Sequence, residues 1–186
     1  MGKVTCVTMV VLLLVSASTF AAEVPKAEVF GGYSMSRMPS SWTNNLNGWN
    51  ASVAGNLNSW FGLAGDFSGY YASPEISISS LNIPIGPEQS QYMYLLGPQF
   101  SYRGFGRVVP FTHVLVGKVH SSSGLFGFNY SNSSAFAAAV GGGLDIPLSK
   151  MIAIRAIQAD YLMTRFDQGS QNNARLSAGI VFRFGN

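Results

Sequence analysis

The sequence predicts an all-β protein, an eight-stranded antiparallel up-and-down barrel that crosses a membrane. Three observations lead to this prediction. Only 10% of the 186 residues are charged, whereas an ordinary soluble domain carries about a quarter. Apolar and polar residues alternate in several segments, as they do in a strand with one face toward lipid and the other toward a lumen. The polar stretches between these segments also alternate in length, long and then short.

The N-terminal segment, residues 1–21, is expected to be a signal peptide. Lys3 supplies a short positive region, residues 10–15 are an unbroken aliphatic run, and small residues follow. Cleavage after Ala21 would place small residues at both positions that require them, whereas cleavage after Ala22 would place Phe20 at one of them. We therefore favour cleavage after Ala21.

The mature chain is then residues 22–186, one barrel domain. An uncleaved anchor is the alternative, but the apolar run is well short of the roughly 20 residues that span a bilayer. The only cysteine, Cys6, lies in the segment to be removed. The mature chain therefore has no disulfide, no thiolate metal site and no cysteine nucleophile, although disulfides are permitted in an oxidising compartment.

The first half of the domain contains four candidate strands. Residues 27–37 form a plausible strand with a noisier pattern than the others. The pattern is clear in residues 49–57, 61–71 and 92–102, where apolar and aromatic residues occupy alternate positions and small or polar residues lie between them. Asp66 falls on the expected lumen side, so the first charge of the barrel interior comes from the third strand.

The fifth and sixth strands are expected at residues 108–121 and 134–146. In the fifth, the parity of Lys118 would place His113 on the lipid face unless a bulge intervenes, so the register of this strand stays open. The sixth strand alternates regularly, and its parity places Asp145 on the lumen side.

The seventh and eighth strands are expected at residues 151–166 and 174–184. Arg155 and Asp160 fall on opposite parities of the seventh strand, and a β-bulge near Ala156 would bring both to the lumen side. The eighth strand alternates most regularly of all, with arginines on one face and aliphatic or aromatic residues on the other.

The connections alternate in length along the whole domain. Long polar stretches are residues 38–48, 72–88, 122–133 and 167–172, and short turns are residues 58–60, 104–107 and 147–150. In transmembrane barrels the long loops face outside, and the short turns and both chain ends face the periplasm. A soluble sandwich or lipocalin-like barrel would instead place its apolar residues inside. The inner faces expected here are too small and polar to fill a dry core.

Charged residues of both signs are expected inside the barrel or near its ends, namely Asp66, Asp145, Arg155, Asp160, Arg175 and Arg183. A salt-bridged interior is the expected arrangement, because an unpaired buried charge costs several kcal/mol. Such a network could be purely structural or could gate small solutes. Aromatic residues near strand ends suit interfacial girdles, namely Trp49, Trp60, Tyr71, Tyr92, Tyr102, Phe105 and Phe182.

Two segments carry a family resemblance. Residues 135–162 contain three consecutive glycines before Asp145 and then Arg155, Asp160 and Tyr161 in an R-x-x-x-x-D-Y pattern. Residues 172–185 contain a final strand with alternating aromatic residues. Both resemble the outer-membrane β-barrel domain family that includes the small outer membrane protein A-like, porin-family barrels.

The resemblance implies a transmembrane barrel that the barrel assembly machinery inserts into the outer membrane. That machinery reads the end of the last strand, which here corresponds to Ile180, Phe182 and Phe184. This chain departs from the pattern because Gly185 and Asn186 follow the last aromatic residue. Many family members carry an added peptidoglycan-binding domain; none is expected here, so the resemblance does not imply anchoring to the cell wall.

The leading expectation is an exported protein of the bacterial outer membrane with a structural or surface-interaction role, recognition depending on four outer loops. A narrow pore for small solutes and a lipid-modifying enzyme are the alternatives. His120 precedes serines at residues 121–123, but no acidic residue is close in sequence and a triad needs a third orienting group. No catalytic, metal or cofactor site is therefore assigned.

The expected partners follow from composition and resemblance. Outer-membrane lipid surrounds the barrel, and the assembly machinery acts during biogenesis. The net charge is only +3 and the basic residues are scattered singly, so no nucleic-acid partner is expected. A monomer is the expected state.

Overall fold

The computed structural model describes residues 24–37, 45–72, 88–125, 128–166 and 169–185. Within these ranges no helix is long and apolar enough to cross a membrane. The predicted signal cleavage site at Ala21 and Ala22 lies outside the described residues. The described strands are β1 (Ala27–Arg37), β2 (Asn45–Asn56), β3 (Phe61–Ala72), β4 (Glu88–Ser101), β5 (Val109–Leu125), β6 (Phe128–Pro147), β7 (Ile152–Phe166) and β8 (Gly169–Phe184).

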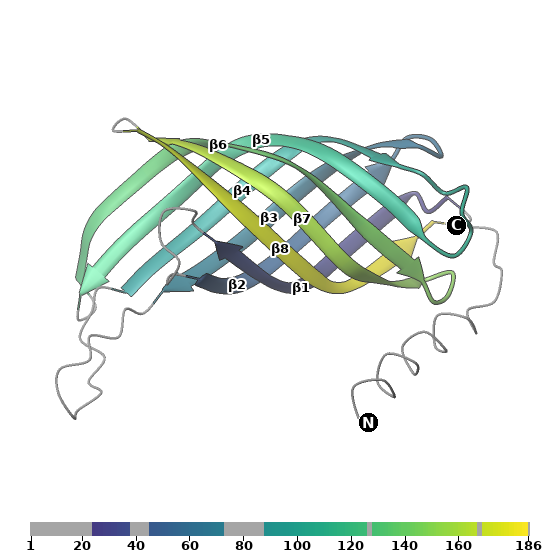
Figure 1. The fold of residues 1–186 in the computed structure, drawn as a ribbon, viewed down its shortest axis with the longest axis horizontal. Coiled ribbons are helices and arrows are strands. Elements are labelled where there is room, and N and C mark those ends of the chain that lie inside the picture. The colour runs from purple at the N-terminus through teal and green to yellow at the C-terminus, as the bar shows by residue number, and fades with distance from the viewer. Residues whose placement is uncertain (1–23, 38–44, 73–87, 126–127, 167–168, 186) are drawn as a thin grey trace, which may run out of the picture.

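The eight strands form one closed antiparallel barrel in which each strand pairs with its neighbours in sequence (Figure 1). Closure is made by β1 and β8, which pair from Ala27 opposite Phe184 to Arg37 opposite Ala174. A closed sheet has no free edge, so the backbone groups of every strand find partners within the protein. The predicted fold class, an all-β up-and-down barrel, is confirmed.

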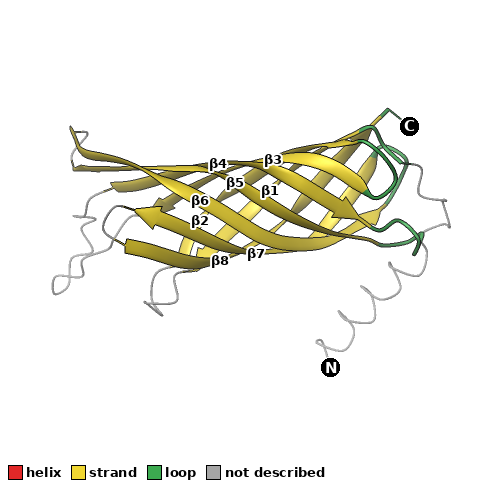
Figure 2. Cartoon of the chain, turned by 90° about the horizontal axis from the view of Figure 1, so that it is seen from above, coloured by secondary structure: helices red, strands yellow, loops and turns green. Residues whose placement is uncertain are grey.

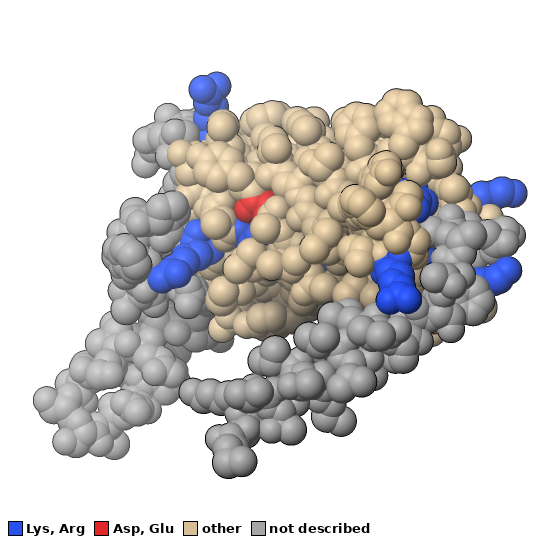
Figure 3. Space-filling view, turned by 45° about the vertical axis from the view of Figure 1, so that its right-hand side comes forward, with Lys and Arg blue, Asp and Glu red and all other residues tan. Residues whose placement is uncertain are grey.

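The outer surface of the barrel is mostly apolar, and the four carboxylates whose burial the structure describes lie inside. Glu28, Asp66, Asp145 and Asp160 are all buried, whereas residues such as Val140 are half exposed on the outer wall. On the face drawn in Figure 3, Lys and Arg side chains project mainly toward the two ends, and other residues make up most of the band between them. The distribution is the reverse of that in a soluble barrel.

Part of the lumen is apolar, whereas the sequence predicts inner faces too small and polar to fill a dry core. A buried cluster comprises Ala54, Ala64, Met93, Leu95, Leu115, Val119, Ala135, Ala137, Ala139 and Leu162. The larger side chains come from β4, β5 and β7, and alanines of β2, β3 and β6 leave room for them. That expectation is therefore wrong for this part of the interior.

The inward face of β5 differs from one sequence expectation. His113 is buried in the lumen at 3% exposure, and Lys118 lies on the outer face. The strand keeps one register against β4 from Leu96 opposite Val116 to Gln99 opposite His113. His113 and Lys118 thus lie on opposite faces by simple alternation, and no bulge is needed to bring His113 inside.

The predicted bulge in β7 is confirmed. The pairing of β7 with β8 shifts between Arg155 and Gln158, and the pairing of β6 with β7 shifts at the same level. Ala156 and Ile157 consequently lie next to each other on the outer face. Arg155 and Asp160, which simple alternation would place on opposite faces, both lie in the lumen.

The short connections gather at one end of the barrel together with both ends of the described chain, here called the turn end (Figure 2). Side chains fix these turns, since Asn58 Oδ1 accepts hydrogen bonds from the backbone N–H groups of Trp60 and Phe61 at 3.0 and 2.7 Å. Ser149 Oγ likewise accepts from the N–H of Ile152 at 3.1 Å. We call the opposite end, where β5 and β6 extend toward each other, the hairpin end.

Two of the four expected long loops are mostly strand. β5 continues to Leu125 and β6 begins at Phe128, while β7 continues to Phe166 and β8 begins at Gly169. The expectation of loops at residues 122–133 and 167–172 is therefore wrong. Their serines and asparagines resemble loop composition, but ladder hydrogen bonds join backbone groups and do not require apolar side chains.

Candidate functional site

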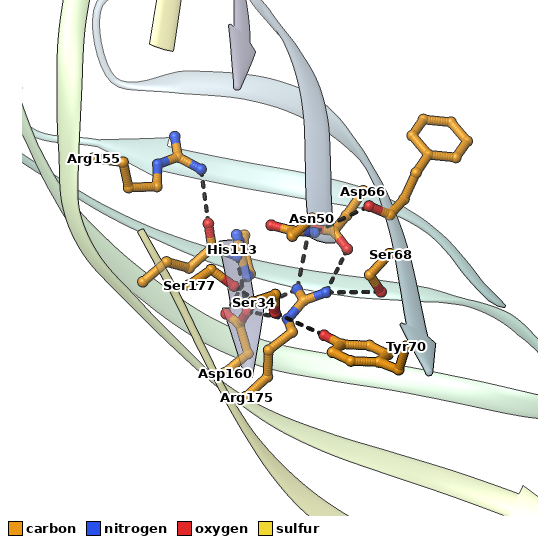
Figure 4. A network of polar contacts seen from close by, with 12 residues as sticks. Ser34, Asn50, Asp66, Ser68, Tyr70, His113, Arg155, Asp160, Arg175 and Ser177 are labelled. Atoms are coloured by element: carbon orange, nitrogen blue, oxygen red, sulfur yellow. Dashed lines mark hydrogen bonds and ion pairs between the residues drawn. The ribbon is translucent and has the colours of Figure 1, made fainter. Parts of the chain in front are cut away.

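The lumen contains a continuous network of charged and polar side chains (Figure 4). The structure places all six interior charges named from the sequence inside the barrel, each at most 6% exposed. Five of them belong to one chain of contacts that crosses the lumen, namely Asp145, Arg155, Asp160, Arg175 and Asp66. Arg183 belongs to a separate cluster near the turn end.

Arg175 is at the centre of the network and is completely buried. Its two terminal nitrogens donate to the two carboxylate oxygens of Asp66 at 2.6 and 3.1 Å, a bidentate pair. Its Nε donates to Oδ2 of Asp160 at 2.7 Å. One guanidinium from β8 thus joins carboxylates from β3 and β7, on opposite sides of the lumen.

Asp160 accepts hydrogen bonds at both carboxylate oxygens. His113 Nε2 lies 2.8 Å from Oδ1, and Gln158 Nε2 donates to Oδ2 over 2.8 Å. The β7 bulge makes this arrangement possible, because it brings Gln158 to the lumen together with Arg155. His113 was not among the interior residues predicted from the sequence. An ionisable side chain is costly when it faces hydrocarbon, and this cost could have placed His113 on the lumen side.

Arg155 connects this centre to the turn end of the lumen. It donates to Asp145 through Nε and Nη2 at 2.8 and 3.0 Å, and through Nη1 to Gln158 at 2.8 Å. The rings of Phe30 and Phe111 lie on its guanidinium, with centroids 4.4 and 4.1 Å from Cζ. Cation–π contacts strengthen when they are shielded from water, as here.

A second charged cluster lies at the turn end. Glu28 of β1 contacts Arg103 at 3.4 Å and Arg183 of β8 at 3.7 Å. Arg103 also donates to the backbone carbonyl of Ser59 at 2.7 Å, which ties two turns together. Arg103 could not be placed from the sequence because a residue in a turn belongs to neither face of a strand. Glu28 could not be placed because the first strand alternates poorly.

Small hydroxyl groups complete the polar side of the lumen. Ser34 Oγ lies 2.9 Å from the hydroxyl of Tyr70 and 2.9 Å from Oγ of Ser177. Asn50 donates to Oδ2 of Asp66 at 2.9 Å. All four side chains are buried or nearly so, and they join β1, β2, β3 and β8 around Arg175.

This arrangement is chemically suited to cross-linking the barrel wall. Each charged group is engaged with a group of opposite charge from another strand, and Asp160 holds three donors. No group of His, Cys, Asp or Glu suited to a metal ion occurs among the described residues. His120, the residue weighed for lipid chemistry, lies on the outer face and contacts Ser134 Oγ at 3.0 Å, with no described carboxylate bonded to its ring.

The aromatic residues expected at strand ends lie toward both ends of the barrel. At the turn end Trp60 stacks on Phe100 at 6.0 Å, and Tyr102 meets Phe105 at 5.0 Å. At the hairpin end Tyr71 meets Tyr92 edge to face at 6.2 Å. Trp49 and the residues matched to the insertion signal are also half exposed on the outer wall, namely Ile180, Phe182 and Phe184.

Comparison with solved structures finds small outer-membrane barrels. Ail, the attachment invasion locus protein of Yersinia pestis, is 22% identical, with 86% of this chain and 100% of that chain covered and a TM-score of 0.56. Neisserial surface protein A is 13% identical over 85% of this chain and 96% of its own, with a TM-score of 0.63. OprG of Pseudomonas aeruginosa is 10% identical over 89% and 99%, with a TM-score of 0.57.

These similarities confirm the fold expected from the resemblance, that of the small eight-stranded outer-membrane barrels. No protein-family model and no curated protein matches the chain.

Proposed function

We propose that this chain is an integral protein of the bacterial outer membrane with a filled lumen and a structural or surface-interaction role. The observation that carries the proposal is the inverted distribution of side chains. Residues such as Val53, Val114 and Val140 are about half exposed on the outer wall, while the charges interlock inside. Such a surface is stable in hydrocarbon and unfavourable in water.

The filled lumen favours a structural role over a pore. An eight-stranded barrel is narrow enough for side chains to occupy its interior. Here Arg175, Gln158 and Leu115 are each fully buried, and the apolar cluster adjoins the ion network. Glu28 and Arg103 add a charged contact across the turn end.

The strand lengths support a role at the cell surface. About 9 to 11 residues of a tilted strand cross the hydrocarbon, whereas β5 has 17 residues and β6 has 20. Since the short turns close the opposite end, the excess length projects at the hairpin end. In the proposed orientation this end faces the exterior, so paired strands as well as loops would present the recognition surface.

Thiol labelling of intact cells tests the location and orientation. The sole cysteine, Cys6, lies in the predicted signal peptide. In the mature chain, an introduced cysteine is therefore expected to be the only thiol that reacts. A membrane-impermeant maleimide is expected to label Ser134→Cys in intact cells, because Ser134 is exposed and pairs with His120 near the hairpin end. Leu148→Cys, exposed at the turn end, is the matched control and is expected to react only after the cells are broken.

Labelling of Leu148→Cys in intact cells would reverse the proposed orientation. Protection of both positions until lysis would contradict the outer-membrane location. The unaltered chain, carried through the same procedure, gives the background.

A further inference from the structure

Two basic side chains occupy one row on the outer wall near the hairpin end. Lys118 of β5 pairs with Phe136 of β6, and Phe136 pairs with Arg165 of β7. Neighbouring strands are about 4.8 Å apart, so the backbones that carry the two cations are separated by roughly 10 Å. Both side chains are exposed, and neither takes part in the ion pairs found between described residues.

Apolar rows lie directly beneath these cations, on the side toward the turn end. The next outward row is Val116, Ala138 and Met163, and the one after it is Val114, Val140 and Tyr161. Five of these six side chains are among the half-exposed large hydrophobic residues of the wall, with 45–54% exposure, namely Val114, Val116, Val140, Tyr161 and Met163. On β5 and β7 the wall therefore changes from a cation to apolar residues within one row, and Phe136 of β6 lies between the two cations.

The depth of the cationic row matches a membrane boundary. The segment from Val109 to Lys118 corresponds to the roughly 9 to 11 residues that cross the hydrocarbon. Lys118 thus reaches the outer headgroup level, where lysine and arginine extend their charged ends toward the polar region. His120, the next outward residue of β5, contacts Ser134 at 3.0 Å and adds a polar pair just beyond the cations.

We propose that Lys118 and Arg165 form a binding site for the phosphate group of an outer-leaflet lipid whose acyl chains lie on the two apolar rows. The inference rests on the proposed outer-membrane location. A phosphorylated, acylated glucosamine disaccharide, the lipid core of lipopolysaccharide, has the matching chemistry, an anionic head above several chains. A free phosphate ion would contact only the exposed cations, so the apolar rows would not contribute to its affinity.

Lipid titration of the folded barrel tests the site. Native mass spectrometry in zwitterionic detergent would compare the diphosphorylated lipid, the same lipid without phosphates, and inorganic phosphate as a competitor. The double variant Lys118→Gln/Arg165→Gln is expected to bind the diphosphorylated lipid about 25-fold more weakly, because each basic residue at an anionic lipid surface strengthens binding roughly fivefold. The unaltered protein is expected to bind the dephosphorylated lipid comparably weakly.

The matched control is Lys26→Gln/Arg107→Gln, which removes one exposed lysine and one exposed arginine at the turn end. Its lipid affinity is expected to be unchanged. An equal loss in both double variants would overturn the site, since it would indicate attraction by net charge alone. Equal binding of the dephosphorylated lipid, or full displacement by inorganic phosphate, would overturn it as well.

Folding is monitored separately by the gel mobility of unheated and heated samples of each variant. A barrel that folds and inserts into bilayers without preferring the phosphorylated lipid contradicts only this inference. A chain that does not insert contradicts the proposed function itself.

Discussion

Replacement of Arg175 by methionine is expected to lower the free energy of unfolding by about 3–5 kcal/mol, the range for breaking a buried ion pair by removing one partner. Methionine occupies similar space but leaves Asp66 and Asp160 without their common cation in a lumen where all three residues are at most 3% exposed. Urea unfolding of the barrel in lipid vesicles, followed by gel mobility of unheated samples, measures the change.

Two further variants separate this effect from the loss of any arginine. Arg107→Met removes an exposed arginine at the turn end and is expected to change stability by less than about 0.5 kcal/mol. Adding Asp66→Asn and Asp160→Asn to Arg175→Met removes the uncompensated charges and is expected to restore much of the loss. Equal urea midpoints for Arg175→Met and Arg107→Met would show that the network does not stabilise the barrel.

Replacement of Val114 by arginine is expected to destabilise the bilayer-embedded barrel by about 2–4 kcal/mol, the cost of an arginine at the midplane of a lipid-facing wall. Val114 is 46% exposed and lies midway along the segment from Val109 to Lys118. The same vesicle unfolding assay measures this effect.

Ser134→Arg is the control for Val114→Arg, because Ser134 is exposed and pairs with His120 near the hairpin end. Close to the interface the expected cost falls to about 0–1 kcal/mol. If both arginines were equally harmless in the bilayer, the exposed apolar wall would not be in contact with hydrocarbon.

The fold was largely predictable because successive residues of a strand lie on opposite faces of the sheet. In the last strand the alternation of Arg175 and Arg183 with aliphatic and aromatic residues placed each side chain on the correct side. The bulge near Ala156 followed from the same rule, since only an extra residue brings Arg155 and Asp160 to one face.

The alternation of faces does not predict which interior charges contact one another. Parity places Arg175 and Asp66 inside, but they are 109 positions apart in sequence, and their contact depends on the stagger of all eight strands. The face of His113 stayed open because apolar residues occupy both parities of β5, and the polar residues Lys118 and His120, which share the other parity, lie on the outer face.

Strand length was also unpredictable from side-chain pattern. Beyond the hydrocarbon, β5 and β6 no longer need an apolar face, and backbone pairing continues there from Val119 opposite Ala135 to Leu125 opposite Phe128. The end of the apolar alternation in the sequence indicates where the strand leaves the hydrocarbon. The length of the strand depends instead on where its backbone hydrogen bonds end.

Membrane fractionation combined with heat-modifiable gel mobility tests the central claim, that the chain is a membrane-embedded barrel, most directly. Expressed in a bacterium with two membranes, the protein is expected in the outer-membrane fraction, where the closed sheet resists detergent until boiling. Unheated and boiled samples should therefore migrate differently. A product found in the soluble fraction, with the same mobility before and after boiling, would contradict the account.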